Sequence, residues 1–99
     1  MPKDANWAYD LEITLVEGEG ICAADHEIGE TWTWKGNTEQ LDFGKGLCVH
    51  ALNSMLPKLI AMRYGARLPW LKADADTATH LCPDVTSPHV FRIRRTRAA

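Results

Sequence analysis

The chain has 99 residues, of which 45% are hydrophobic and 24% are charged, and its formal net charge is −2. This length and composition predict one small globular domain over residues 1–99, with a loose leader at 1–7 and a loose tail at 96–99. The slightly acidic charge argues against nucleic-acid binding, although four arginines stand between residues 92 and 97. No segment approaches the roughly 20 apolar residues of a membrane helix, and the first residues lack the apolar core of a signal peptide. We therefore expect a cytoplasmic protein with neither a nucleic-acid nor a membrane partner.

The hydrophobic pattern predicts strands near both ends of the chain. Residues 8–20 alternate between apolar and polar side chains, with Leu11, Ile13 and Leu15 on one face, as a half-buried strand does. Residues 31–34 (TWTW) and 89–96 (HVFRIRRT) repeat the alternation and predict a second strand and a last strand.

The middle of the chain predicts one helix. Apolar residues recur at steps of four and three within residues 47–65, and Gly65 stands where a helix C-cap is expected. Pro57 lies inside this pattern and should kink or split the helix, because proline removes a donor and crowds the preceding turn. Residues 66–84 predict a long return segment with one helical turn near 74–79. We therefore expect an α+β fold in which a small antiparallel sheet of about three or four strands packs on one Pro-kinked helix.

Three cysteines and four histidines carry most of the chemistry that this chain offers. Each cysteine has a histidine within four residues, in the pairs Cys22–His26, Cys48–His50 and His80–Cys82. Thiolate and imidazole groups suit zinc, iron and iron–sulfur clusters, although the spacing contains no Cys-x-x-Cys pair and is not diagnostic. An odd number of cysteines in a cytoplasmic protein argues against a disulfide framework.

A cofactor-free enzyme is the alternative interpretation. Cys48 is expected in the first helical turn, where unpaired N–H groups favour a thiolate. It would act on a small carbonyl-type substrate, with His26 or Asp84 as acid–base group. The walls of the substrate pocket would be tryptophans: Trp32, Trp34 and Trp70. A third interpretation is a binding subunit with inert thiols, because Cys48 also lies on the apolar face of the helix and cysteine packs as a small hydrophobe.

Several short motifs add to this pattern by their order along the chain. Cys22, His26 and Gly29 form a C…H..G motif, and Gly46, Cys48 and Ala51 form G-x-C-x-x-A. These are followed by five further elements: Pro57, Gly65, Pro69-Trp70, Cys82-Pro83-Asp84 and Phe91. In this order, from about residue 10 to residue 95, the chain resembles a family of small prokaryotic single-domain proteins without an established activity.

The resemblance implies that four residues act as a set: Cys22, His26, Cys48 and Cys82. Such a set fits the four-coordinate arrangement of zinc, and it would also suit iron or an iron–sulfur cluster. The chain departs from the family at Asp25, where glycine is usual, and at Val85, where proline is usual, so loop geometry differs there. The sequence thus predicts a metal-binding Cys/His site. Its four tryptophans are many for a chain of this size and suggest a hydrophobic interface in a homo-oligomer.

Overall fold

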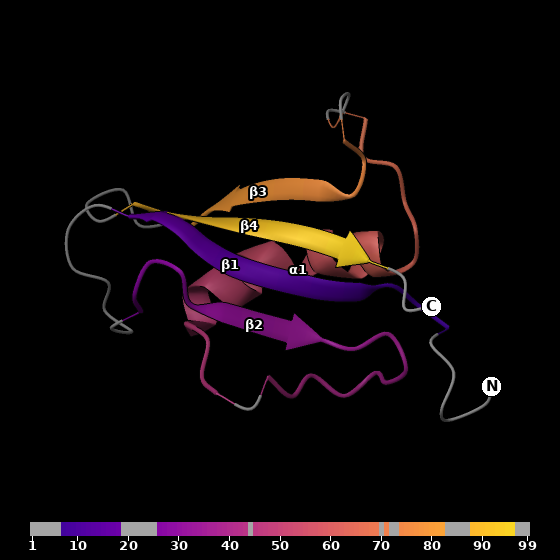
Figure 1. Ribbon diagram of the computed structural model, residues 1–99, viewed down its shortest axis with the longest axis horizontal. Coiled ribbons are helices and arrows are strands. Elements are labelled where there is room, and N and C mark those ends of the chain that lie inside the picture. Colours follow the sequence, from indigo (N-terminus) through magenta and orange to yellow (C-terminus); the bar gives the residue numbers. More distant parts are fainter. Residues whose placement is uncertain are drawn as a thin grey trace.

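The computed structural model describes residues 7–18, 26–43, 45–69, 71, 74–82 and 88–96. Within these ranges the chain forms four strands and one helix: β1 (Asp10–Gly18), β2 (Thr31–Trp34), α1 (Val49–Arg63), β3 (Thr77–Leu81) and β4 (His89–Thr96). The strands pair antiparallel in the order β2-β1-β4-β3, and α1 lies across one face of this sheet (Figure 1). The predicted α+β fold is therefore confirmed. In the ranges given above, no helix has the length and apolarity needed to cross a membrane.

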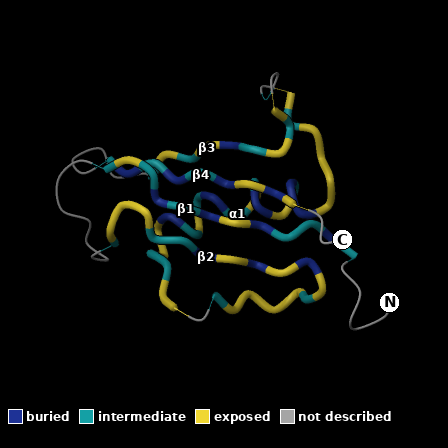
Figure 2. The backbone as a smooth tube through the Cα atoms, viewed as in Figure 1, coloured by how far each residue is buried: buried dark blue, intermediate teal, exposed yellow. Residues whose placement is uncertain are grey.

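The core lies between α1 and the inner face of the sheet. Leu11, Ile13 and Leu15 of β1 are fully buried, as their alternation predicted, and strands β2 and β4 show the same alternating burial (Figure 2). The helix contributes four buried apolar side chains: Ala51, Met55, Leu59 and Met62. Complete burial of a large apolar side chain stabilises a fold by about 1.5–3 kcal/mol. This small core therefore depends on few residues, and polar contacts at its margins matter correspondingly more.

Helix α1 continues through Pro57 as one element, so the chain does not divide into two helices there. Pro57 cannot donate to the carbonyl of Asn53, but both residues are exposed, and solvent can satisfy that carbonyl. A bend at Pro57 stays a prediction.

Strand β3 corrects one expectation, because residues 74–79 do not form a helical turn. The Asp76 N–H donates to Asp74 Oδ1 over 2.9 Å, which closes a tight turn instead. The chain then pairs with β4 from Thr77 onwards, placing Ala78 in the core. The long return segment thus supplies the fourth strand, at the edge of the sheet.

A buried arginine closes the C-terminal end of α1. Arg95 follows Phe91 and Ile93 on the inner face of β4 and is only 5% exposed. Its Nη1 donates to the carbonyls of Met62 (3.2 Å) and Ala66 (2.7 Å), and its Nε donates to Asp76 Oδ1 (2.9 Å). Arg95 therefore satisfies backbone acceptors that a helix end leaves open.

Arg63, the last residue of α1, is fully buried and fixes the connection that leaves β2. Its Nη2 donates to the carbonyls of Lys35 (2.9 Å) and Thr38 (2.7 Å). The guanidinium also lies 3.9 Å from the centre of the Trp34 ring. Hydrogen bonds and a cation–π contact therefore offset part of the cost of burying this charge.

The neighbouring arginines of β4 offer a matched test of this packing. Arg95→Met should lower the free energy of unfolding by about 2–4 kcal/mol, because it leaves the buried Met62 carbonyl, the partly buried Ala66 carbonyl and Asp76 without the Arg95 donors. Arg94→Met, on the exposed face of the same strand, should cost less than about 0.5 kcal/mol. Urea unfolding of both variants measures the difference. Equal losses would show that Arg95 does not act through its buried contacts.

Candidate functional site

Three strand ends meet at one end of the sheet. Gly18, the last residue of β1, pairs with His89 at the start of β4, and the Cys82 N–H donates to the His89 carbonyl over 2.8 Å. The His89 ring lies directly against Gly18, where a Cβ would come within 2.5 Å of its Cδ2 atom. A side chain at this position would require the His89 ring to move. The cysteine after β3 is thus held beside the beginning of β4.

The start of α1 lies at the same end. Lys58 Nζ donates to the Thr79 carbonyl over 2.9 Å, and one residue later His80 lies 2.8 Å from the hydroxyl of Ser54. Successive residues of β3 therefore contact helix residues that lie closer to the N-terminus of α1. Cys82 is two residues further, which is about 7 Å along a strand. Cys82 therefore continues β3 in the direction of the helix N-terminus.

Cys48 stands at the N-cap of that turn and makes no side-chain capping hydrogen bond. Like Cys82, it is partly buried and packs on the common apolar core. Two of the three predicted cysteines therefore lie at one end of the molecule.

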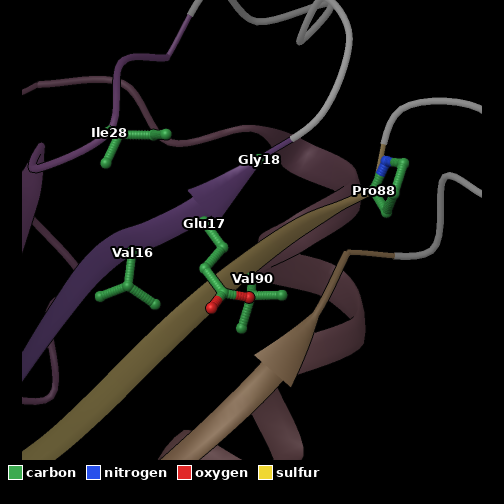
Figure 3. Close-up of a pocket in the computed structure, with 6 residues that line it drawn as sticks. All are labelled: Val16, Glu17, Gly18, Ile28, Pro88 and Val90. Atoms are coloured by element: carbon green, nitrogen blue, oxygen red, sulfur yellow. The ribbon is translucent and has the colours of Figure 1, made fainter.

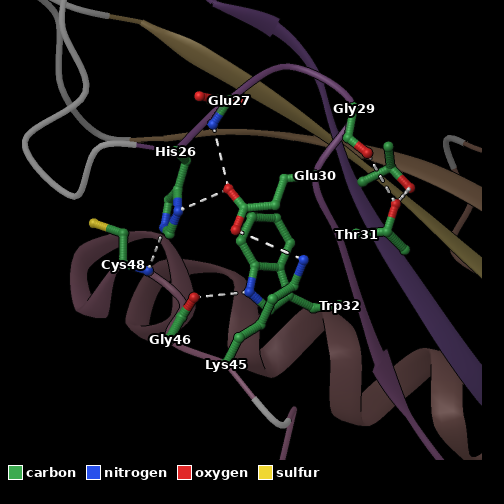
Figure 4. A network of polar contacts seen from close by, with 10 residues as sticks. His26, Glu27, Gly29, Glu30, Thr31, Trp32, Lys45, Gly46 and Cys48 are labelled. Carbon is green, nitrogen blue, oxygen red and sulfur yellow. Dashed lines mark hydrogen bonds and ion pairs between the residues drawn. The ribbon is translucent and has the colours of Figure 1, made fainter.

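His26 takes the place of the missing cap. The Cys48 N–H donates to His26 Nε2 over 2.9 Å (Figure 4). Because Nε2 accepts this hydrogen bond, the imidazole is neutral and carries its proton on Nδ1. Nδ1 lies 3.3 Å from Glu30 Oε1. His26 thus satisfies one of the open donors of α1 from 22 residues away in the sequence.

Trp32 and Lys45 complete this network. The Trp32 Nε1–H donates to the Gly46 carbonyl over 2.8 Å, and its ring meets the edge of His26 at a centre-to-centre distance of 4.8 Å. Lys45 Nζ lies 5.0 Å from the centre of the Trp32 ring and 3.6 Å from Glu30 Oε2. The segment before α1 is therefore attached to β2 through both a buried indole and an ion pair.

The charges around Glu30 favour its ionised form. Burial raises the pKa of this carboxyl, but a hydrogen bond from the Glu27 N–H, the charge of Lys45 and a hydrogen bond from the His26 Nδ1–H together outweigh burial and hold the pKa below its usual range. A hollow of about 470 Å³ opens here, and His26, Glu30, Lys45 and Cys48 line part of it. The Cys48 Sγ points away from the imidazole in Figure 4, so the thiol–imidazole pair of the enzyme interpretation is not formed in this arrangement.

A second hollow, of about 410 Å³, opens beside the same end of the sheet (Figure 3). Val16 and Val90, on the face that α1 does not cover, form its floor with Glu17, and Ile28 and Pro88 form its margins. Among the described residues, this hollow presents one carboxylate, Glu17, among apolar walls.

The other predicted residues have varied positions. Cys22, Trp70 and Asp84 lie outside the described residues. Trp32 and Trp34 are core side chains, 1% and 5% exposed, and neither borders the hollow beside Cys48. In the part of the chain that the structure describes, no group of three or more His, Cys, Asp or Glu residues is arranged to hold a metal ion.

The other three histidines differ in burial, and His89 lies at the end of the sheet that holds Cys82. His50 is exposed, as predicted, and His80 is partly buried against α1. His89 is only 6% exposed and lies at the same end as Cys82. Sequence reasoning also passed over Glu30 and Lys45; the position of Glu30, four residues after His26, was the available signal for the first of them.

Comparison of the chain with family models, with curated proteins and with solved structures finds no match. The family resemblance based on the ordered motifs therefore stays a prediction.

His26 and His50 give a matched pair for testing the capping role. His26→Phe keeps a ring beside Trp32 but leaves the Cys48 N–H without its acceptor, so the free energy of unfolding should fall by about 1–2 kcal/mol. His50→Phe, in the exposed first turn of α1, should cost less than about 0.5 kcal/mol. Urea unfolding near neutral pH compares them. Similar losses in both variants would rule out a cap at His26.

Glu30→Gln tests the electrostatic part of the network. A carboxyl whose pKa is lowered in the folded state contributes stability above its unfolded pKa and loses that contribution as the pH falls through its folded pKa. Glu30→Gln should therefore be less stable than the unmodified chain at neutral pH, by less than about 1 kcal/mol for a partly exposed pair. The deficit should disappear below the ordinary carboxyl value of 4.5. A deficit that is constant with pH would contradict this account.

Proposed function

We propose that this protein binds a metal ion, most simply zinc, through Cys22, His26, Cys48 and Cys82. The observation that carries the proposal is the contact of His26 with the Cys48 backbone, at the end of the sheet where β3 leads into Cys82; the three side chains do not form a ligand cluster in the metal-free arrangement. In the sequence, Cys22 is four residues from Gly18 and four from His26, and both of these flanking residues belong to that end. Three thiolates and one imidazole are a known ligand set for four-coordinate zinc.

The donor chemistry of the described residues supports this choice. Cys48 lies at the N-terminus of α1, where the helix dipole favours the thiolate that metals require. His26 is a neutral imidazole, which is the ligating form, and Glu30 lies within reach of its Nδ1–H. A carboxylate in that position commonly orients a metal-bound imidazole and raises its basicity.

Metal binding has a local cost, because His26 Nε2 accepts the Cys48 N–H in the metal-free arrangement. Ligation through Nε2 replaces that hydrogen bond, so the metal must compete with the helix cap. The Cys48 Sγ, which points away from the imidazole in Figure 4, must also turn toward the ion. In return, it joins the segment before β2, the start of α1 and the end of β3. Such a link adds binding free energy to the stability of a small core. Iron or an iron–sulfur cluster would use the same thiolates.

Cobalt titration of the reduced, metal-free full chain tests the ligand set. We expect binding of about one equivalent of Co²⁺ with sulfur-to-cobalt charge-transfer absorption, and displacement of the cobalt by Zn²⁺. Cys22→Ser, Cys48→Ser and Cys82→Ser should each weaken Co²⁺ binding by at least about tenfold, the scale found when even an outer contact of a metal site is lost. His50→Gln, two residues after Cys48 but outside the proposed set, should leave binding unchanged.

Two results would overturn the proposal. One is a reduced chain that binds neither metal at equimolar concentration while remaining folded by circular dichroism. The other is Co²⁺ binding that persists unchanged in the Cys22→Ser and Cys82→Ser variants, which would indicate a site elsewhere.

A further inference from the structure

A second polar cluster lies midway along α1, away from the Cys/His end. Ser54 and Lys58 are one turn apart on the helix, and His80 of edge strand β3 faces both. His80 Nε2 is 2.8 Å from Ser54 Oγ, and His80 Nδ1 is 3.4 Å from Lys58 Nζ. The cluster thus places a hydroxyl, an imidazole and an amine in one row.

The hydrogen bonds fix where the protons lie. Ser54 Oγ donates to the Ala51 carbonyl over 3.1 Å, so its hydrogen is already used. The hydroxyl oxygen must then accept from His80 Nε2–H, which leaves a lone pair on Nδ1 directed at Lys58. Lys58 Nζ also donates to the Thr79 carbonyl. Besides its bond to Cε, Nζ has three tetrahedral positions. Two of them are directed at the Thr79 carbonyl and at His80 Nδ1, and the third is available to a ligand.

The surroundings disfavour the charged form of Lys58 relative to a lysine in water. No described carboxylate pairs with Lys58, and burial lowers the pKa of its ammonium group. The hydrogen bonds leave His80 Nδ1 without a proton and facing Nζ. When the amine is neutral, the third position on Nζ holds its nucleophilic lone pair.

A hollow of about 310 Å³ lies beside this amine. Ser54 and Lys58 line it together with three apolar side chains: Pro57, Ala61 and Leu68. Its polar groups therefore stand on the helix, and its walls suit a short hydrocarbon substituent.

We propose that Lys58 is an imine-forming amine for small aldehydes or ketones with a short apolar substituent, and that His80 handles the proton. The hollow walled by Pro57, Ala61 and Leu68 receives the substituent, and the carbonyl carbon meets Nζ. This site is independent of the proposed metal site.

The reaction is a condensation without net oxidation or reduction. The Lys58 lone pair forms the N–C bond while the carbonyl π bond breaks and its oxygen takes a proton from solvent. His80 Nδ1 accepts a proton from the new ammonium centre, giving the carbinolamine. The hydroxyl then leaves as water, taking the proton that His80 returns, and the nitrogen lone pair forms the C=N bond. Overall, the carbonyl compound, the amine and one proton from solvent give a protonated imine and water, and His80 returns to its starting form.

Reductive trapping in the full chain tests the proposal. The protein is incubated with butanal and sodium cyanoborohydride near pH 7, and peptide mass spectrometry gives the initial rate at each lysine. Lys58 should be alkylated about tenfold faster than Lys35, whose side chain is 66% exposed, because a desolvated amine is the better nucleophile. In urea-unfolded protein this preference should disappear. His80→Gln should slow Lys58 several-fold and leave the rate at Lys35 unchanged.

A folded chain in which Lys58 reacts no faster than Lys35 would overturn the proposal, and Lys58 would then only cover the open edge of β3. A preference for Lys58 that persists in urea would also overturn it, because the folded cluster would not be its cause. Fast alkylation that is unaffected by His80→Gln would refute the proton-transfer role of His80.

Discussion

The hydrogen bond from the Cys48 N–H to His26 Nε2 is the contact on which the functional end of this molecule depends. Helix α1 starts at a cysteine that makes no side-chain cap, so an open backbone donor would otherwise remain at its N-terminus. His26 satisfies it and is itself positioned by Trp32 and Glu30. The geometry of Cys48 and the neutral form of His26 therefore have one physical cause.

Polar side chains also hold α1 in place at its middle and at its C-terminal end. Arg95 satisfies carbonyls at its C-terminal end, and Lys58 and Ser54 bind the edge strand β3 at its middle. In a domain of this size the apolar core is limited, so polar side chains from different elements hold the helix on the sheet. Two of these contacts, at His26 and at Lys58, also place reactive groups beside hollows, which is why both carry functional proposals.

Much of the fold could be predicted from periodicity, whereas the site could be predicted only in part. In β1, β2, β4 and α1 the pattern of apolar residues within the segment itself indicates which face is buried. Strand β3 was missed because its single core residue, Ala78, is small and the preceding aspartates resemble a helix start. The role of His26 could not be predicted, because its partner is a backbone N–H, which leaves no residue-type signal. Arg95 continues the alternation of Phe91 and Ile93, which predicts an inward position. Its charge, however, is typical of a surface residue.

The most direct test of this account is nitrogen NMR of the His26 ring, in isotope-labelled protein before and after equimolar Zn²⁺. In the metal-free protein, Nε2 should resonate as an unprotonated nitrogen with scalar coupling to the Cys48 amide across the hydrogen bond. Addition of Zn²⁺ should abolish that coupling and shift Nε2 into the metal-bound range, while the His50 ring stays unchanged. A protonated Nε2 in the metal-free protein would contradict the cap, and His26 signals that do not respond to Zn²⁺ would contradict the metal site.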